Sequence, residues 1–317
     1  MMTSVGEAIL NLIFFPGFVF TAVVGLLVSW IDRKISARIQ WRKGPPWYQP
    51  FADIIKLLGK EIILPGGRKR SVFLLAPLLA LAGVTLVSTI VWKANLSSSL
   101  LDEGFVGDLI VVLYLLTLPS LAIIIGGSAS GNPYASVGAS REIKLLLGYE
   151  LPFLLAILTL VVKTGGGIEF SRILAFQQQG RPLVGYFSGV IAFIVAIISS
   201  QAKLGLVPFD IAEAETEINS GPMIEYSGAP LAVFRISKAM LLFVLPVFLV
   251  TVFWGGMVFD AWETAIYSVI KYLVILIIMI LIKNTNPRLR IDQALKFLWG
   301  PLTGLALVGL VLSIVGV

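Results

Sequence analysis

Apolar residues lie along this chain in long continuous blocks, and polar residues fall mainly between the blocks. About 20 mostly apolar residues suffice to cross the ~30 Å hydrocarbon layer as a helix, and backbone groups in lipid must bond within their own segment. The pattern predicts an all-α polytopic membrane protein, a bundle of about eight transmembrane helices plus an interfacial amphipathic helix. The predicted spans, in one transmembrane domain over residues 1–317, are about 8–31, 71–92, 107–127, 143–163, 184–205, 235–255, 264–283 and 297–317.

The predicted amphipathic helix follows Pro50, where apolar and charged positions alternate at helical spacing. Its apolar face comprises Phe51, Ile54, Ile55, Leu58 and Ile62, and its polar face comprises Asp53, Lys56 and Lys60. Such a helix suits the membrane interface. The alternative is an ordinary surface helix beside a basic loop that only sets topology.

Composition and charge placement support this class. Only 13% of residues are charged, against about a quarter in soluble domains. Of the 24 Lys and Arg, 19 fall on one side of the predicted spans and five on the other. The positive-inside rule then places both termini outside the cell membrane, and the net charge of +6 needs no nucleic-acid partner. Glu7 precedes the first block, which is too long for a cleaved signal peptide and is expected to be an anchor.

The chain contains no Cys and no His. Iron–sulfur clusters need Cys thiolates, and haem or zinc sites usually need His or Cys. We therefore expect no cofactor, no metal site and no catalytic residue in this chain.

Two carboxylates fall within the fourth predicted span. Glu150 lies roughly 12 Å along a helix from Glu142, inside an apolar block. An ionisable group at that depth is a functional candidate by default, and Pro152 can open the helix beside it. The alternative is a structural carboxylate paired with a neighbouring helix or subunit.

Five carboxylates lie within 16 residues between the fifth and sixth spans: Asp210, Glu213, Glu215, Glu217 and Glu225. If the segment is helical, Asp210, Glu213 and Glu217 share one face, and crowding raises some of their pKa values. Such a cluster can store and release protons. A solvated acidic face or a docking patch for a partner explains it equally well. Arg288 and Arg290 could neutralise the cluster, although their pattern alone favours positive-inside charge.

Taken together, several segments resemble the H subunit (subunit 1) of respiratory complex I and its homologues in energy-converting membrane-bound hydrogenases. The segments, in matching order over nearly the whole chain, are Asp32–Lys34, Ala37–Gln40, Gly44–Pro45, Gln49–Pro50 with Asp53 and Lys56–Leu58, Tyr149–Glu150, Pro208–Asp210 with Glu213–Glu215, Ile224–Gly228, and Pro287–Arg288 with Arg290 and Asp292–Gln293. Two features resemble the hydrogenase-related branch more closely. Pro46–Pro50 follows Gly44–Pro45 directly, and the segment between Glu217 and Glu225 reads Ile-Asn-Ser-Gly-Pro-Met-Ile. A separate departure from the family pattern is Asp32, which stands where the family commonly has Glu.

The resemblance implies a membrane-anchor and coupling subunit that links a peripheral redox arm to antiporter-like subunits moving protons or sodium. It implies peripheral iron–sulfur and hydrogenase-like partners, which carry the iron–sulfur clusters and, in hydrogenases, nickel–iron, with lipid as a further contact. By resemblance, the ion path and coupling residues are Glu142, Glu150, Asp210, Glu213, Glu215, Glu217 and Glu225. The residues of redox-arm docking or of a quinone-like cavity are Asp32, Arg33, Arg38, Gln40, Asp53, Lys56, Arg288, Arg290 and Asp292.

Within that family we expect a ferredoxin-fed complex that reduces protons or sulfur species. One alternative is the quinone-site subunit of a true complex I. A stand-alone secondary ion transporter is a second alternative, although the chain lacks the inverted repeat that many such folds contain. A third is an assembly scaffold whose carboxylates only dock partners.

Overall fold

The computed structural model describes residues 5–66, 69–96 and 107–316. Within these ranges the chain is a bundle of helices without strands, which confirms the all-α prediction. The elements, in order, are α1 (Val5–Ile13), α2 (Phe18–Ile39), α3 (Gln49–Leu58), α4 (Arg70–Leu96), α5 (Asp108–Leu115), α6 (Leu118–Ala129), α7 (Pro133–Lys163), α8 (Phe170–Gln179), η1 (Leu183–Gly185), α9 (Phe187–Lys203), α10 (Glu215–Ile218), η2 (Gly221–Met223), α11 (Gly228–Phe253), α12 (Trp262–Thr285), α13 (Ile291–Phe297), the π-helical turn η3 (Leu298–Leu302) and α14 (Thr303–Val315).

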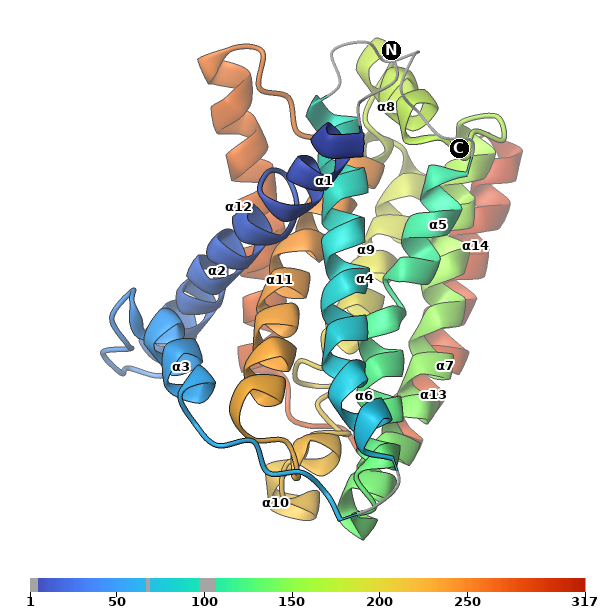
Figure 1. Ribbon diagram of the computed structural model, residues 1–317. Helices are drawn as coiled ribbons and strands as arrows, with labels where there is room; N and C mark the ends of the chain where they lie inside the picture. The colour runs from blue at the N-terminus through green and yellow to red at the C-terminus, as the bar shows by residue number, and fades with distance from the viewer. Residues whose placement is uncertain (1–4, 67–68, 97–106, 317) are drawn as a thin grey trace.

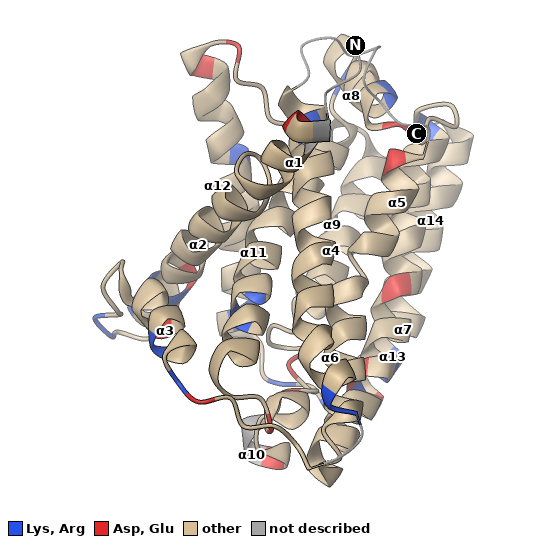
Figure 2. Ribbon diagram, viewed as in Figure 1, with Lys and Arg blue, Asp and Glu red and all other residues tan. Residues whose placement is uncertain are grey.

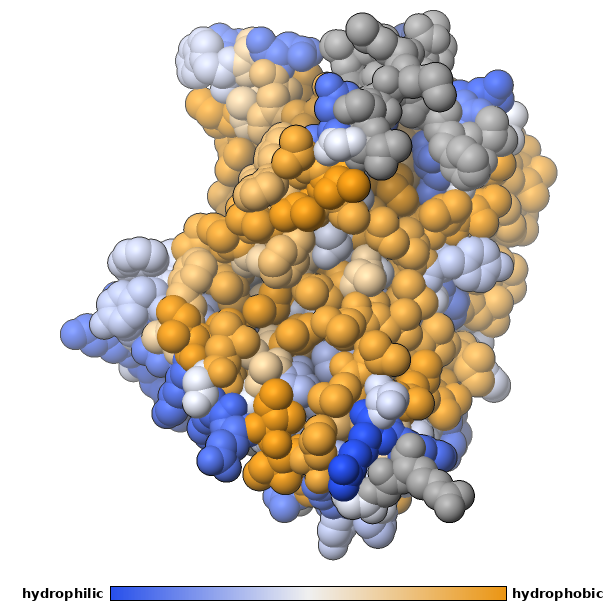
Figure 3. All heavy atoms as spheres, viewed as in Figure 1, coloured by the Kyte–Doolittle hydropathy of each residue, from blue (hydrophilic) through white to orange (hydrophobic). Residues whose placement is uncertain are grey.

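Seven helical stretches in the described ranges are long and apolar enough to cross a membrane, and α9 is a shorter apolar helix. Figure 3 shows apolar residues covering the middle of one face, with hydrophilic residues towards both ends. Helix α1 and the last turns of α14 lie at the same end of the bundle, while α3, α10 and α13 lie at the other end (Figure 1). The molecule is therefore a multi-pass membrane protein.

Two of the predicted spans are interrupted. The first is α1 followed by α2, with a break over Phe14–Gly17 and a helix that continues to Ile39, eight residues beyond the predicted end at 31. The break is fixed against α4, because the hydroxyls of Thr21 and Ser88 lie 2.6 Å apart and Ser88 donates to the Pro16 carbonyl at 3.1 Å. The third span is α5 and α6, separated at Leu116–Thr117.

Helix α11 forms the centre of the bundle and contacts α2, α3, α4, α8, α9 and α12. Close packing there depends on small residues, as is usual between membrane helices. A Cβ added to Gly25 of α2 would meet the Ala239 carbonyl oxygen of α11 at 2.7 Å. At the end of the bundle that carries α1, Gln177 of α8 donates to the Val252 carbonyl at 3.0 Å and so ties α8 to the end of α11.

Helix α3 occurs where the amphipathic pattern predicts it but ends at Leu58, so Lys60 and Ile62, which the pattern assigns to its two faces, lie beyond it. Ile54 and Leu57 are buried against α11, whereas Ile55 and Leu58 remain exposed. The exposed apolar residues suit the membrane interface, and the buried ones attach the helix to the bundle.

Candidate functional site: a chain of cavities and ion pairs

Three adjoining cavities lie between the helices at the end that carries α3, α10 and α13. The α2–α3 cavity, about 360 Å³, is lined by residues of α2, α3, α11 and α12, including Asp32, Asp53 and Lys283. The central cavity, about 50 Å³, is lined by Ser120, Glu142, Lys203 and Glu213 among others. The α13 cavity, about 250 Å³, is lined by Arg141, Asp210, Glu217, Arg288, Arg290 and Asp292 among others.

Shared lining residues connect the three cavities. Lys238 and Leu204 line both the α2–α3 cavity and the central cavity. Asp210 and Ile211 line both the central cavity and the α13 cavity. Neighbouring cavities therefore have part of their walls in common.

The α2–α3 cavity is lined by two ion pairs. Lys283 Nζ donates to Asp32 Oδ2 at 2.7 Å, and Asp32 is buried. Arg33 Nη1 donates to Asp53 Oδ2 at 3.0 Å and so joins α2 to α3. Arg235, which also lines this cavity, forms no ion pair within the described part of the chain, so basic charge exceeds acidic charge here.

The Asp53 carboxylate keeps its charge over a wide pH range. Burial raises its pKa, but hydrogen bonds from Arg33 and Gln49 and the charges of Arg33 and Arg235 outweigh that effect and hold the pKa below its ordinary value of 3.8. The bridge to Arg33 is therefore present at neutral pH and is lost only as the pH falls below that value. Because both side chains are partly exposed, the bridge is worth about 1 kcal/mol or less.

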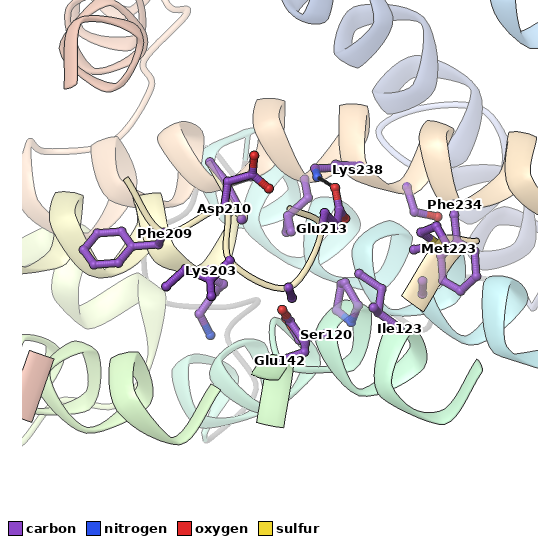
Figure 4. A pocket seen from close by; sticks show the side chains of 18 residues that line it. Ser120, Ile123, Glu142, Lys203, Phe209, Asp210, Glu213, Met223, Phe234 and Lys238 are labelled. Carbon is purple, nitrogen blue, oxygen red and sulfur yellow. Dashed lines mark hydrogen bonds and ion pairs between the residues drawn. The ribbon is translucent and has the colours of Figure 1, made fainter. Parts of the chain in front are cut away.

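The central cavity joins a carboxylate–ammonium pair to a line of hydroxyl groups. Lys238 Nζ donates to Glu213 Oε2 at 2.6 Å. Figure 4 shows this pair on one side of the loop that carries Asp210, and Glu142 with Ser120 on the other side. The Ser120 and Glu142 side chains line this cavity together, and the Ser120 hydroxyl lies 3.0 Å from the Tyr149 hydroxyl.

Glu150 forms an ion pair with Lys203 of α9, at 2.9 Å between Oε2 and Nζ. The Lys203 side chain is fully buried and that of Glu150 is 18% exposed. Lys203 Nζ also lies 4.9 Å from the centre of the Phe153 ring and 5.3 Å from that of Tyr149. Because Lys203 lines the central cavity, the series of ionisable groups continues from that cavity to Glu150.

Sequence reasoning counts Lys203 and Lys238 only as positive-inside charges. A lysine at the inner end of an apolar span satisfies that rule wherever its side chain points, so the rule gives no ground to pair it with an acid. The run Ser199-Ser200-Gln201, which ends two residues before Lys203, is the available hint, since polar residues seldom end a span without a role.

The acidic loop does not present its carboxylates on one helical face, so the condition for a crowded acidic face is not met. Residues 209–213 form turns, and the helix α10 begins only at Glu215. Instead, Asp210, Glu213 and Glu217 each meet a cation of another element. Arg288 binds Asp210 at 2.8 Å, Lys238 binds Glu213 at 2.6 Å and Arg141 binds Glu217 at 2.6 Å. Paired in this way, the acids are spread over two cavities and do not crowd one another.

Several predicted site residues lie apart from the central cavity. Glu225 accepts a 2.6 Å hydrogen bond from Asn132, whose side chain caps α7, and lines none of the three cavities. Arg290 lines the α13 cavity but pairs with no described carboxylate, so of the two expected counter-charges only Arg288 acts as one. The Glu215 side chain lies outside the described structure.

Three residues of the predicted docking group also lie outside the three cavities. Gln40 contacts Asn284 at 3.4 Å, at the junction of α2 and α12. Arg38 and Lys56 do not line the cavities either, although residues near them in the sequence line the α2–α3 cavity.

The structure brings together part of the coupling group that is predicted from the sequence. Glu142, Glu150, Asp210, Glu213 and Glu217 lie along the cavities and their ion pairs.

Comparison with known proteins identifies the family to which this arrangement belongs. The sequence matches the family described as NADH dehydrogenase over residues 11–314. The chain belongs to the family of the H subunit (subunit 1) of complex I. This confirms the resemblance drawn from the motifs.

Two curated relatives illustrate how much of the chain is shared within the H-subunit family. The H subunit of NADH-quinone oxidoreductase from Dehalococcoides mccartyi (strain ATCC BAA-2266 / KCTC 15142 / 195) is 34% identical over 307 residues, which cover 94% of this chain and 83% of the relative. The H subunit numbered 2 of the same oxidoreductase from Syntrophobacter fumaroxidans (strain DSM 10017 / MPOB) is 32% identical over 309 residues, which cover 92% of this chain and 90% of the relative.

A solved structure extends the similarity to the fold. A chain of the membrane-bound sulfane sulfur reductase (MBS), an archaeal respiratory membrane complex, superposes with a TM-score of 0.84 at 30% identity, covering 98% of this member of the H-subunit family and all of that chain. The relatives are thus subunits of respiratory membrane complexes made of several subunits.

Proposed function

We propose that this member of the H-subunit family is the membrane-anchor and coupling subunit of a ferredoxin-fed, complex I-like respiratory complex, and that it links a peripheral redox arm to proton or sodium translocation. One observation carries the proposal. Ionisable groups follow one another from the α2–α3 cavity through Lys238–Glu213 and Glu142 to the buried pair Lys203–Glu150.

The chemistry of these groups suits coupling. A charge inside the membrane is costly, so a buried charge is kept only where an opposite charge pairs with it. Because the protein interior screens charge weakly, such a pair responds strongly to a change in charge nearby. A change in charge at the α2–α3 cavity alters the field on Lys238, which lines that cavity and binds Glu213. The altered pair in turn acts on Glu142 across the central cavity. The hydroxyls of Ser120 and Tyr149 extend from Glu142 towards Lys203, whose ammonium holds Glu150.

The choice of a hydrogenase-type or sulfur-reducing complex rests on two supports. The segment from Gly44 to Pro50 resembles the hydrogenase-related branch, and the fold is similar to a chain of a sulfane sulfur reductase complex. We assign the redox cofactors, iron–sulfur clusters and in hydrogenases nickel–iron, to peripheral subunits, since this chain has no Cys or His to bind them. Antiporter-like membrane subunits are the proposed recipients of the ion.

The quinone-site subunit of a true complex I is the second candidate. In its favour, the α2–α3 cavity holds about 360 Å³ and combines apolar walls such as Leu26 and Leu242 with charged groups. The curated relatives are themselves named for quinone. Reduction of a soluble quinone analogue by the purified complex, blocked by bulky substitutions at Leu26, would favour this second candidate.

Substitution of Glu213 tests the coupling role. In the complex reconstituted into sealed vesicles, Glu213→Gln should leave electron transfer to an artificial acceptor largely intact and strongly lower the number of ions moved per electron, followed for both H⁺ and Na⁺. The matched control is Glu225→Gln, because Glu225 lies off the cavities and an amide can still accept from Asn132. Unchanged pumping per electron in Glu213→Gln would reject the proposal.

A further inference from the structure

Two serine hydroxyls on α9 are buried without a hydrogen-bond partner. The side chains of Ser199 and Ser200 are fully inaccessible to solvent, and neither Oγ has a partner among the residues that the structure describes. Buried polar atoms in proteins are almost always bonded, so unpaired ones point to a bound molecule or ion.

Other buried hydroxyls in this bundle satisfy themselves within their own helix. Thr85, Thr159, Ser237 and Thr251 each donate to the carbonyl four residues earlier, at 2.7 to 3.0 Å. Ser199 and Ser200 lie in the equally regular helix α9, where each could donate to the carbonyl four residues earlier, yet neither forms that bond. Their hydroxyls therefore point elsewhere.

Helix geometry places these hydroxyls beside the buried ion pair. At about 100° per residue, Lys203 lies between Ser199 and Ser200 around the helix axis. Side chains on a helix lean towards its N-terminus, so the Lys203 side chain runs back over the turn that carries both serines. An ammonium has three donors, and one of them is directed to Glu150 at 2.9 Å.

We infer that Ser199, Ser200 and the Lys203 ammonium together bind one or more water molecules, on the side of the Lys203–Glu150 pair that faces the helical turn carrying the two serines. A water is the ligand whose size and chemistry match, because it accepts from the ammonium and exchanges hydrogen bonds with two hydroxyls. Hydration keeps Lys203 charged although its side chain is fully buried.

This water pocket is closed on its deeper side. The residues of the next turns, Ala192, Val195 and Ala196, are apolar and buried. The closed end has one consequence that rests on the proposed function: the ion path does not continue along α9 to the opposite membrane surface. Water binding at the two serines can be measured without turnover, so the inferred water site and the proposed coupling function can each fail without the other.

The natural absence of cysteine allows a direct test with single-Cys variants of the assembled complex. Ser199→Cys and Ser200→Cys are nearly isosteric, and Ala196→Cys is the control, because Ala196 is fully buried on the same helix in an apolar environment. Neutral, membrane-permeant methyl methanethiosulfonate enters apolar surroundings but reacts only with the thiolate, which needs water and is favoured by Lys203.

We expect the thiols at 199 and 200 to be modified about tenfold faster than the thiol at 196, as measured by the intact mass of the chain. Equal rates would overturn the inference. If a variant fails to assemble, a density map of the unmodified complex at a resolution that shows ordered water decides the question. A water peak within hydrogen-bonding distance of either serine Oγ supports the site, and its absence at both contradicts it.

Discussion

At the level of single residues, the ion pairs of this chain divide into exposed and buried ones. Arg33–Asp53 and Arg141–Glu217 are partly exposed, so each contributes little to stability. Lys203–Glu150 is different, because the lysine is fully buried and its charge has lost its bulk water. Removing one partner of such a pair leaves an uncompensated charge in a medium of low dielectric constant.

The buried pair gives a stability prediction. Glu150→Gln leaves Lys203 without its counter-charge and should destabilise the folded protein by about 3 kcal/mol. The double variant Glu150→Gln with Lys203→Met removes both charges and should recover most of that loss. Thermal unfolding of the purified complex measures both, with Lys144→Met, an exposed lysine of α7, as the control. A double variant no more stable than Glu150→Gln would contradict the pairing.

Only part of the site is predictable at this scale. Glu150 stands out in the sequence because a carboxylate in an apolar block is rare and costly. Its partner lies 53 residues away on another helix, and that contact is set by packing, which the sequence pattern does not encode. The same holds for Arg141 and Lys238. Helical spacing describes the acidic loop wrongly, because residues 209–213 form turns.

At the level of elements, close helix packing holds the α2–α3 cavity in shape. Helix α2 crosses α11 at Gly25, where the Ala239 carbonyl oxygen and the Met240 Cα leave no space for a side chain. Both elements line the cavity and carry Asp32, Arg33 and Lys238. A change at the crossing therefore alters the site from a distance.

Gly25→Ala tests this crossing. The added methyl group would meet the backbone of α11 at 2.7 Å, which cannot rotate away, so we expect a loss of about 1–3 kcal/mol in the free energy of unfolding. Gly304→Ala in α14 is the matched control, because a Cβ there meets open space and alanine favours helix. Equal stability of the two variants in thermal unfolding would show that the crossing is loose.

The hydropathy pattern locates the spanning helices better than their interruptions. Hydropathy reports the length of an apolar stretch, and both α1–α2 and α5–α6 remain apolar through their breaks. The break at Phe14–Gly17 depends on Thr21 and Ser88, which meet only in the folded bundle. Helix α8 was not predicted, since ten residues between spans are too few to give a membrane signal.

At the level of the whole molecule, charge is distributed unevenly along the bundle. Figure 2 shows basic residues around α3 and at the nearby ends of α4 and α11, and few charged residues across the middle. Helix α1 and the last turns of α14 lie at the opposite end (Figure 1). With the positive-inside rule, this arrangement predicts that the end with the cavities faces the cytoplasm.

Single-Cys labelling tests that orientation. Gln178 of α8 and Asn286 after α12 are both exposed, and the prediction places Gln178 outside the cell and Asn286 in the cytoplasm. On intact cells an impermeant thiol reagent should label Gln178→Cys and spare Asn286→Cys, and Ser71→Cys should be spared as well. Ser98, also predicted to face outside, lies outside the described residues. Labelling of position 286 before position 178 would show that the predicted orientation in the membrane is inverted.

The ratio of ions moved to electrons transferred in Glu150→Gln tests the central claim most directly, because Glu150 ends the series of ionisable groups. The ratio is measured in sealed vesicles containing the complex, with Glu169→Gln, a carboxylate outside the three cavities, as the control. A relay through Glu150 predicts that electron transfer to an artificial acceptor is mostly retained while ion movement per electron drops strongly. A wild-type ratio in Glu150→Gln would show that the carboxylate is structural and that the ion path runs elsewhere.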